Sequence, residues 1–192
     1  MAQRLFTILC CVALMLLWNA VPRLQAQEPE TVLEVKASFV LNFMRFTEWP
    51  PSEVAVAEQH YVLAVVGDTP LAAQIKKSLN GQLINNSPIE VIVYTDLPLL
   101  RRAHSMPHAL FVTAAMSWQW PEIAQFVAAS PVLTIADFPD FCAQGGMLTL
   151  VRKDESIGFE ANPEAARSAY LLLNAQLLQL ANIVSTRRES TP

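Results

Sequence analysis

The sequence predicts one α/β domain, a three-layer sandwich in which helices cover both faces of a mostly parallel sheet and an antiparallel hairpin lies near the C-terminus. Short runs that are apolar throughout alternate with segments of helical character, as in sheets that are buried on both faces. The last two strand-like runs are joined by only three charged residues, too few for a parallel crossover. No repeat or linker divides residues 27–192, whose length suits a single domain.

Residues 1–26 have the pattern of a cleaved export signal. Arg4 supplies the positive charge, residues 5–20 form an apolar run, and Leu24-Gln25-Ala26 ends in a small residue suited to cleavage. An uncleaved anchor is the alternative, but the apolar run is shorter than the roughly 20 residues that a bilayer span needs. We therefore expect an exported protein whose mature domain is residues 27–192.

The charge and cysteine content narrow the possible partners. The chain carries 13 Lys and Arg residues against 17 Asp and Glu residues, and the predicted signal would remove Arg4 and Arg23. Nucleic-acid binding relies on clustered basic residues, so we expect no nucleic-acid partner. Cys142 is the only cysteine after the signal and cannot form an internal disulfide. Its neighbours Phe141 and Met147 favour a buried thiol over an intermolecular bridge.

The first element of the mature domain is a helix over residues 31–48. Thr31 and Glu34 match a capping box at its start, and Trp49-Pro50-Pro51 ends it. Its polar residues form one narrow stripe at helical spacing, namely Glu34, Ser38, Asn42, Arg45 and Glu48. Most of the remaining helix surface is apolar, so we expect the helix to be largely enclosed.

Four apolar runs then predict parallel strands, over residues 61–66, 89–95, 109–113 and 132–136. The segments after the first three predict helices, over residues 70–80, 97–103 and 118–128. Thr69 suits the N-cap of the first of these helices, with Pro70 at its first position. This alternation is typical of a parallel sheet that is covered on both sides.

The last part of the chain departs from that rhythm. Residues 146–152 and 156–160 flank the turn Lys153-Asp154-Glu155 and predict an antiparallel hairpin. Asn162 suits the N-cap of a final helix, with Pro163 at its first position. We expect one long leucine-rich helix that continues to Val184, because apolar residues recur along one helical face.

Motifs that would indicate an enzyme or a metal site are missing from the sequence. It contains no G-x-S-x-G, H-E-x-x-H or C-x-x-C pattern. His104 and His108 have helical spacing, but Pro107 between them disfavours an intact helix. The sequence therefore predicts no catalytic residue, no cofactor and no metal ligand, and a protein that is not an enzyme.

Four polar residues are candidates for ligand binding. Asp68 follows Gly67 at the carboxyl end of a predicted strand, where parallel sheets receive ligands, although an ordinary strand-to-helix turn also explains it. Arg152, Glu160 and Arg167 form a second set around the hairpin and the last helix. Arg167 is expected to pair with an acidic residue, and contact with a ligand carboxylate or phosphate is the alternative.

Five apolar residues are candidates for contact with a protein partner. Leu171, Ala175 and Leu178 lie away from the main apolar face of the predicted last helix. Trp118 and Trp120 lie in a loop-like stretch before Pro121. Exposed apolar patches mark protein contacts, whereas packing against a neighbouring loop would leave these residues without such a role.

In chain order, several segments resemble the signature of the YfiR family of small periplasmic regulators. The resemblance covers residues 33–184, nearly the whole mature chain. The matching segments are residues 36–50, the strand that ends at Gly67-Asp68, the region around Gly81, residues 108–113, residues 133–137, Gly145-Gly146-Met147, residues 159–162 and the closing residues 171–181.

This resemblance implies a periplasmic regulator, dimeric and without catalytic activity. Its relatives bind the periplasmic sensory domain of an inner-membrane diguanylate cyclase and hold the enzyme inactive, and an outer-membrane lipoprotein sequesters the regulator. The chain would then control cyclic-di-GMP output and, through it, biofilm formation. Some relatives form disulfides, which Cys142 alone cannot do. A periplasmic small-ligand receptor, or the sensor subunit of a membrane kinase system, is the alternative function.

Overall fold

The computed structural model describes residues 28–51, 60–128, 130–154 and 156–187, so the predicted export signal lies outside the described residues. Its elements, in chain order, are α2 (Glu30–Arg45), β1 (Thr47–Glu48), β2 (Tyr61–Val66), α4 (Pro70–Leu79), β3 (Leu83–Ile84), β4 (Ser87–Tyr94), α5 (Leu97–Leu100), β5 (Ala109–Val112), the 3-10 helix η1 (Ala114–Gln119), α6 (Trp120–Val127), β6 (Leu133–Ala136), β7 (Leu148–Lys153), β8 (Ser156–Ala161), α7 (Pro163–Ser168), β9 (Leu172–Leu173), α8 (Ala175–Leu180) and β10 (Asn182–Ile183).

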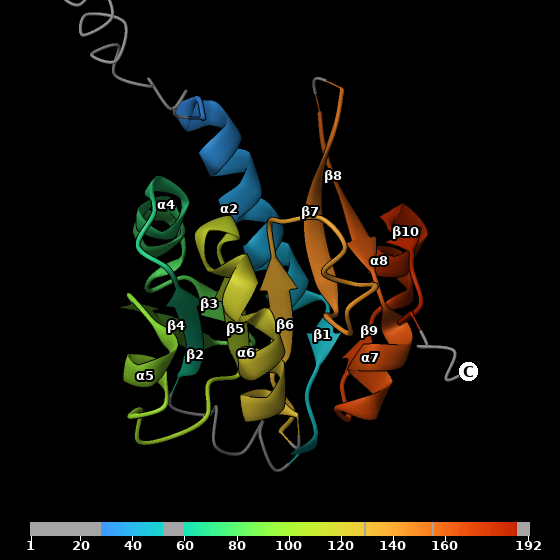
Figure 1. Cartoon of the computed structure of the whole chain (residues 1–192). Helices are drawn as coiled ribbons and strands as arrows, with labels where there is room; N and C mark the ends of the chain where they lie inside the picture. The colour runs from blue at the N-terminus through green and yellow to red at the C-terminus, as the bar shows by residue number, and fades with distance from the viewer. Residues whose placement is uncertain (1–27, 52–59, 129, 155, 188–192) are drawn as a thin grey trace, which may run out of the picture.

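An eight-stranded sheet of strand order β10-β8-β7-β6-β5-β2-β4-β3 forms the middle layer of the described chain (Figure 1). The strands from β7 across to β4 run parallel to their neighbours. β8 pairs with β7 as the predicted antiparallel hairpin, with Lys153 opposite Ser156 at its outer end. The predicted fold class, a mostly parallel sheet in a three-layer α/β sandwich, is confirmed.

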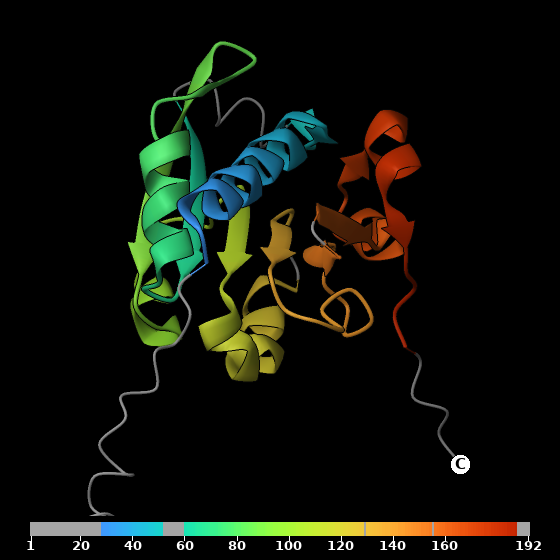
Figure 2. The ribbon, with the colours of Figure 1, turned by 90° about the horizontal axis from the view of Figure 1, so that it is seen from above.

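Helices cover both faces of this sheet because its central strands are apolar on both sides. Leu63 and Val65 of β2 face a core that is shared with α2 and α4, whereas Ala64 and Val66 face a second core under α5 and α6. Figure 2 shows α2 and α4 on one side of the strands and α6 on the other. The continuous apolar run of β2 is the sequence feature that requires this double cover.

The helix α4 begins as the sequence predicts. The Thr69 side chain accepts a hydrogen bond from the backbone N–H of Ala72 at 3.2 Å, and Pro70 occupies the first helical position. In contrast, the capping box predicted for the first helix does not form, so that prediction is wrong. That helix begins at Glu30, and the Pro29 carbonyl accepts hydrogen bonds from Val32 and Leu33, with no side-chain cap at Pro29.

The prediction of one long final helix is also wrong, because several short elements form in its place. Asn162 caps α7 as expected, but α7 ends at Ser168, and Tyr170 takes a left-handed backbone conformation with φ of +59°. The chain then forms β9, which pairs with β1 so that Leu173 lies opposite Thr47, before Asn174 caps the short helix α8.

The energies of burial and helix propensity explain this break. Leu171 is fully buried in the core, and Leu177 of α8 is buried too. Burying a leucine contributes about 1.5–3 kcal/mol. The helix propensities of ordinary residues differ by at most about 0.7 kcal/mol. Tertiary packing and the β1–β9 pairing therefore outweigh the helical preference of this leucine-rich segment.

Candidate functional site

The carboxyl ends of β2 and β5 meet at a position where ligands bind in many parallel sheets, because the later strands β4 and β5 lie on opposite sides of β2. In this protein, side chains occupy that position. Gly67 has a φ of +105°, and a Cβ atom added to it would overlap Thr113 and Met116. The Thr113 hydroxyl donates a hydrogen bond to the Val66 carbonyl at 3.0 Å. Asp68 lies beside this packed edge with an exposed side chain.

A buried ion pair lies at the same edge of the sheet. Lys36 of α2 places its Nζ 3.4 Å from Oδ2 of Asp137, which follows β6, and the two side chains are only 10% and 11% exposed. Lys36 Nζ also lies 2.7 Å from Oε2 of Glu28. The backbone N–H of Ala114 donates to Asp137 Oδ1 at 2.8 Å. These contacts fix the N-terminal half of α2 to the carboxyl ends of β5 and β6.

The protonation of Asp137 is governed mainly by burial. Burial raises the pKa of its carboxyl group, while Lys36 and the N–H of Ala114 act in the opposite direction. This pair could not be predicted from the sequence. A single lysine outside the polar stripe of an otherwise apolar helix was the available signal for Lys36, and its partner is about 100 positions away in the sequence.

Cys142 is fully buried, which confirms the burial predicted from its apolar neighbours. Burial raises the pKa of its thiol to about 12, and the nearby charge of Glu160 acts in the same direction. The thiol therefore stays protonated at neutral pH, and a protonated thiol is a poor nucleophile.

The residues Arg152, Glu160 and Arg167 do not form one cluster. In the β7–β8 hairpin, Arg152 lies opposite Ile157 and Glu160 lies opposite Thr149, so the two charges are three rungs apart, or about 10 Å. Glu160 accepts a hydrogen bond from the Asn182 side chain, and Arg152 donates to the Asp154 carbonyl. Arg167 is exposed on α7, and within the described ranges no ion pair joins it to an acid.

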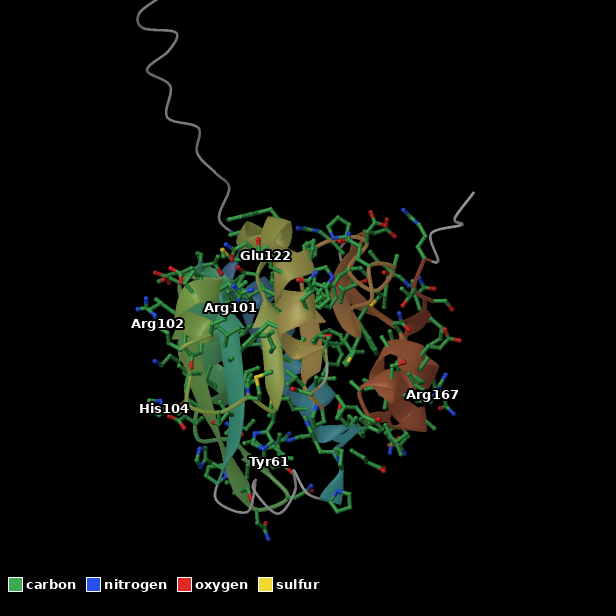
Figure 3. All side chains as sticks on the ribbon, turned by 60° about the horizontal axis from the view of Figure 1, so that its bottom comes forward. Tyr61, Arg101, Arg102, His104, Glu122 and Arg167 are labelled. Atoms are coloured by element: carbon green, nitrogen blue, oxygen red, sulfur yellow. The ribbon has the colours of Figure 1, made fainter. Side chains whose placement is uncertain are left out.

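Figure 3 shows where four of the basic side chains lie. Arg167 is on α7 at one flank of the molecule, and Arg101, Arg102 and His104 are at the other. The Arg101 guanidinium lies 3.9 Å from the carboxylate of Glu122 on α6. Basic charge is thus spread over separate surfaces of the protein.

The five apolar residues expected at a partner surface differ in exposure. Leu171 and Trp120 are buried, so their expected exposure is wrong, and the Trp120 indole donates a hydrogen bond to the Gln144 carbonyl. Leu171 turns inward because the chain leaves the helical conformation at Tyr170. Leu178 is half-buried against the core, whereas Ala175 and Trp118 are exposed.

Other apolar side chains of the same region are exposed instead. Four of the eight large apolar residues that are exposed in the described chain fall within residues 170–183, which we call the C-terminal apolar segment. They are Tyr170 at 78%, Leu172 at 55%, Leu180 at 79% and Ile183 at 52% exposure. Helical periodicity could not identify them, because three short elements replace the single helix.

Across residues 28–51, 60–128, 130–154 and 156–187, no helix has both the length and the apolar character needed to cross a membrane. Within the same ranges, no three or more His, Cys, Asp or Glu side chains are grouped so that they could hold a metal ion.

Comparison with known proteins supplies the functional context. A family model described as YfiR/HmsC-like matches residues 33–182, which is most of the chain. A search among curated proteins returns no match. Proteins of the YfiR/HmsC-like family are periplasmic regulators of diguanylate cyclase signalling and are not enzymes.

Proposed function

Because the chain belongs to the YfiR/HmsC-like family, we propose that the mature protein is a periplasmic repressor of an inner-membrane diguanylate cyclase. It binds the periplasmic sensory domain of that enzyme and holds the cytoplasmic output low, so that cyclic-di-GMP stays scarce. The export signal predicted for residues 1–26 delivers it to this compartment.

The exposure of the C-terminal apolar segment is the observation that most supports a binding role. Leu180 leaves four-fifths of its side chain in solvent, and Tyr170 nearly as much. Large apolar side chains that gather in one short segment are typical of surfaces that another protein covers. We therefore place the cyclase contact on β9, α8 and β10, which lie together at one end of the sheet in Figure 1.

An outer-membrane lipoprotein, the second partner that the resemblance implies, could bind the same C-terminal apolar segment. An outer-membrane lipoprotein that sequesters the regulator would relieve repression by competing for the C-terminal apolar segment. The homodimer expected from the resemblance stays a prediction. Of the five residues first expected at the interface, Ala175 and Trp118 have the exposure that contact requires, and Leu178 has part of it.

Cellular cyclic-di-GMP in a strain that lacks this protein tests the proposed function. We expect the concentration to rise on deletion and to return when the gene is supplied in trans, because removing a repressor frees its cyclase. Immunoprecipitation of the complemented strain should then recover a membrane-bound diguanylate cyclase. An unchanged concentration would contradict the proposal and favour a kinase partner.

A further inference from the structure

A hollow of about 220 Å³ lies on the face of the sheet that α5 and α6 cover. α5 is a single turn of four residues, so it covers β2 and β4 only in part. Val62 and Ala64 of β2, beside Ile92 of β4, form its apolar floor. Because side chains alternate along a strand, Glu90 and Tyr94 of β4 point to the same side as Ile92.

Polar groups surround this floor. Tyr94 and Glu90 line the hollow from β4. His60, just before β2, and His104, between α5 and β5, line it from the connecting segments. His60 Nε2 lies 3.3 Å from Oε2 of Glu90, and this contact is an ion pair only when the histidine is protonated. Burial raises the pKa of the Tyr94 phenol, and the negative charge of Glu90 raises it further, so the hydroxyl keeps its proton.

Glu90 is the acidic residue among the described residues that line the hollow, and that lining includes no Lys or Arg. Arg101 and Arg102 lie on this flank but outside the lining, and the Arg101 guanidinium lies 3.9 Å from the Glu122 carboxylate. A carboxylate at one end of an apolar floor is suited to a cation with an apolar body.

We propose that this hollow binds a small organic amine, whose ammonium group contacts the Glu90 carboxylate while its apolar body lies on Val62, Ala64 and Ile92. The volume is below the roughly 300–1,000 Å³ of sites for drug-sized ligands, so the ligand is a compact monoamine. The site is separate from the C-terminal apolar segment, and it differs from the position of Asp68, Arg152, Glu160 and Arg167.

Phenethylamine is a suitable probe, with hydrocinnamate as an anion of similar size and shape. Each is titrated into the isotopically labelled mature protein, and backbone amide signals are followed by NMR. We expect phenethylamine to shift the signals of β2 and β4 saturably, whereas hydrocinnamate leaves them in place. Glu90→Gln should weaken phenethylamine binding about tenfold or more, as expected for the loss of a charge-assisted contact.

Glu122→Gln is the matched control, because Glu122 is an exposed acid on the same flank but outside the hollow. It should leave the affinity unchanged. Equal shifts with hydrocinnamate would overturn the proposed ligand class. Shifts confined to other elements, or no saturable shift at millimolar phenethylamine, would overturn the site itself. An unchanged affinity of the Glu90→Gln variant for phenethylamine would also overturn the site.

Discussion

Lys36 and Asp137 illustrate how one buried charge can depend on another. Both side chains are nearly excluded from solvent, and each is the other's partner at 3.4 Å. Taking a charge out of water is costly, and the cost is offset only where an opposite charge and hydrogen bonds remain in place. The pair therefore matters to stability mainly when one partner is removed, because the other charge then stays buried without an opposite charge beside it.

Lys36→Met should reduce the free energy of unfolding at neutral pH by about 3–5 kcal/mol, because it leaves the Asp137 carboxylate buried without its lysine. The loss should shrink as the pH falls. The native Asp137 pKa is already raised by burial, and removing Lys36 raises it further, so the native state binds a proton more tightly than the unfolded chain does. Urea denaturation at several pH values measures both effects.

Two further variants complete this test. Lys77→Met removes the exposed pair with Glu30, which has a similar N···O distance of 3.3 Å but is screened by solvent, so it should cost no more than about 1 kcal/mol. The double change Lys36→Met with Asp137→Asn should recover much of the lost stability. A loss that is independent of pH, or equal for Lys36 and Lys77, would contradict the account.

At the scale of elements, the sequence predicted the parallel strands well because each is a short apolar run with polar ends. β2 has the bounds expected, and β5 and β6 each differ by one residue at one end. The strands β1, β9 and β10 have two residues each, too few for any periodicity to mark them. Their positions depend on pairing between distant segments.

The break at Tyr170 explains why the candidate surface was only partly predictable. The sequence places Leu171 and Leu180 in one predicted helix and predicts that Leu171 is exposed. A left-handed residue and a two-residue strand rotate the following chain, so that Leu171 is buried and Leu180 is exposed. A pattern of helical period cannot encode that rotation. Trp118, whose exposure was predicted correctly, lies in the 3-10 helix η1, none of whose residues is buried.

The turn after β2 gives a prediction at this scale. Gly67→Ala should destabilise the protein by about 1–3 kcal/mol more than Gly81→Ala does. Both glycines have positive φ, but a Cβ at Gly67 would overlap Thr113 and Met116, whereas nothing lies within 4 Å of a Cβ at Gly81. Chemical denaturation of the two variants measures the difference. Equal losses would show that the edge around Gly67 is not closely packed.

At the scale of the whole molecule, two apolar cores lie on opposite faces of one sheet, and the C-terminal elements close one end of it. The family could be predicted from the order of weak sequence signals, because together they span nearly the whole mature chain. The surface that such a regulator offers to its partner depends on tertiary structure. Among the described residues, the C-terminal apolar segment holds four of the eight exposed large apolar side chains, which is why we propose it as that surface.

We propose that the C-terminal apolar segment binds the cyclase. The most direct test of this proposal is cyclic-di-GMP measured in strains that carry Leu180→Glu or Leu83→Glu in place of the native protein. Leu83 is a matched control, since it is also exposed but lies on β3 at the opposite edge of the sheet. Both variants should keep the thermal midpoint, because neither side chain contributes to the buried core.

We expect Leu180→Glu to raise cyclic-di-GMP to the level of the deletion strain, since a charge would have to be buried in the contact. Leu83→Glu should keep the low level of the native strain. Full repression by a stable Leu180→Glu protein, or equal loss of repression by both variants, would contradict the assignment of the interface to this segment.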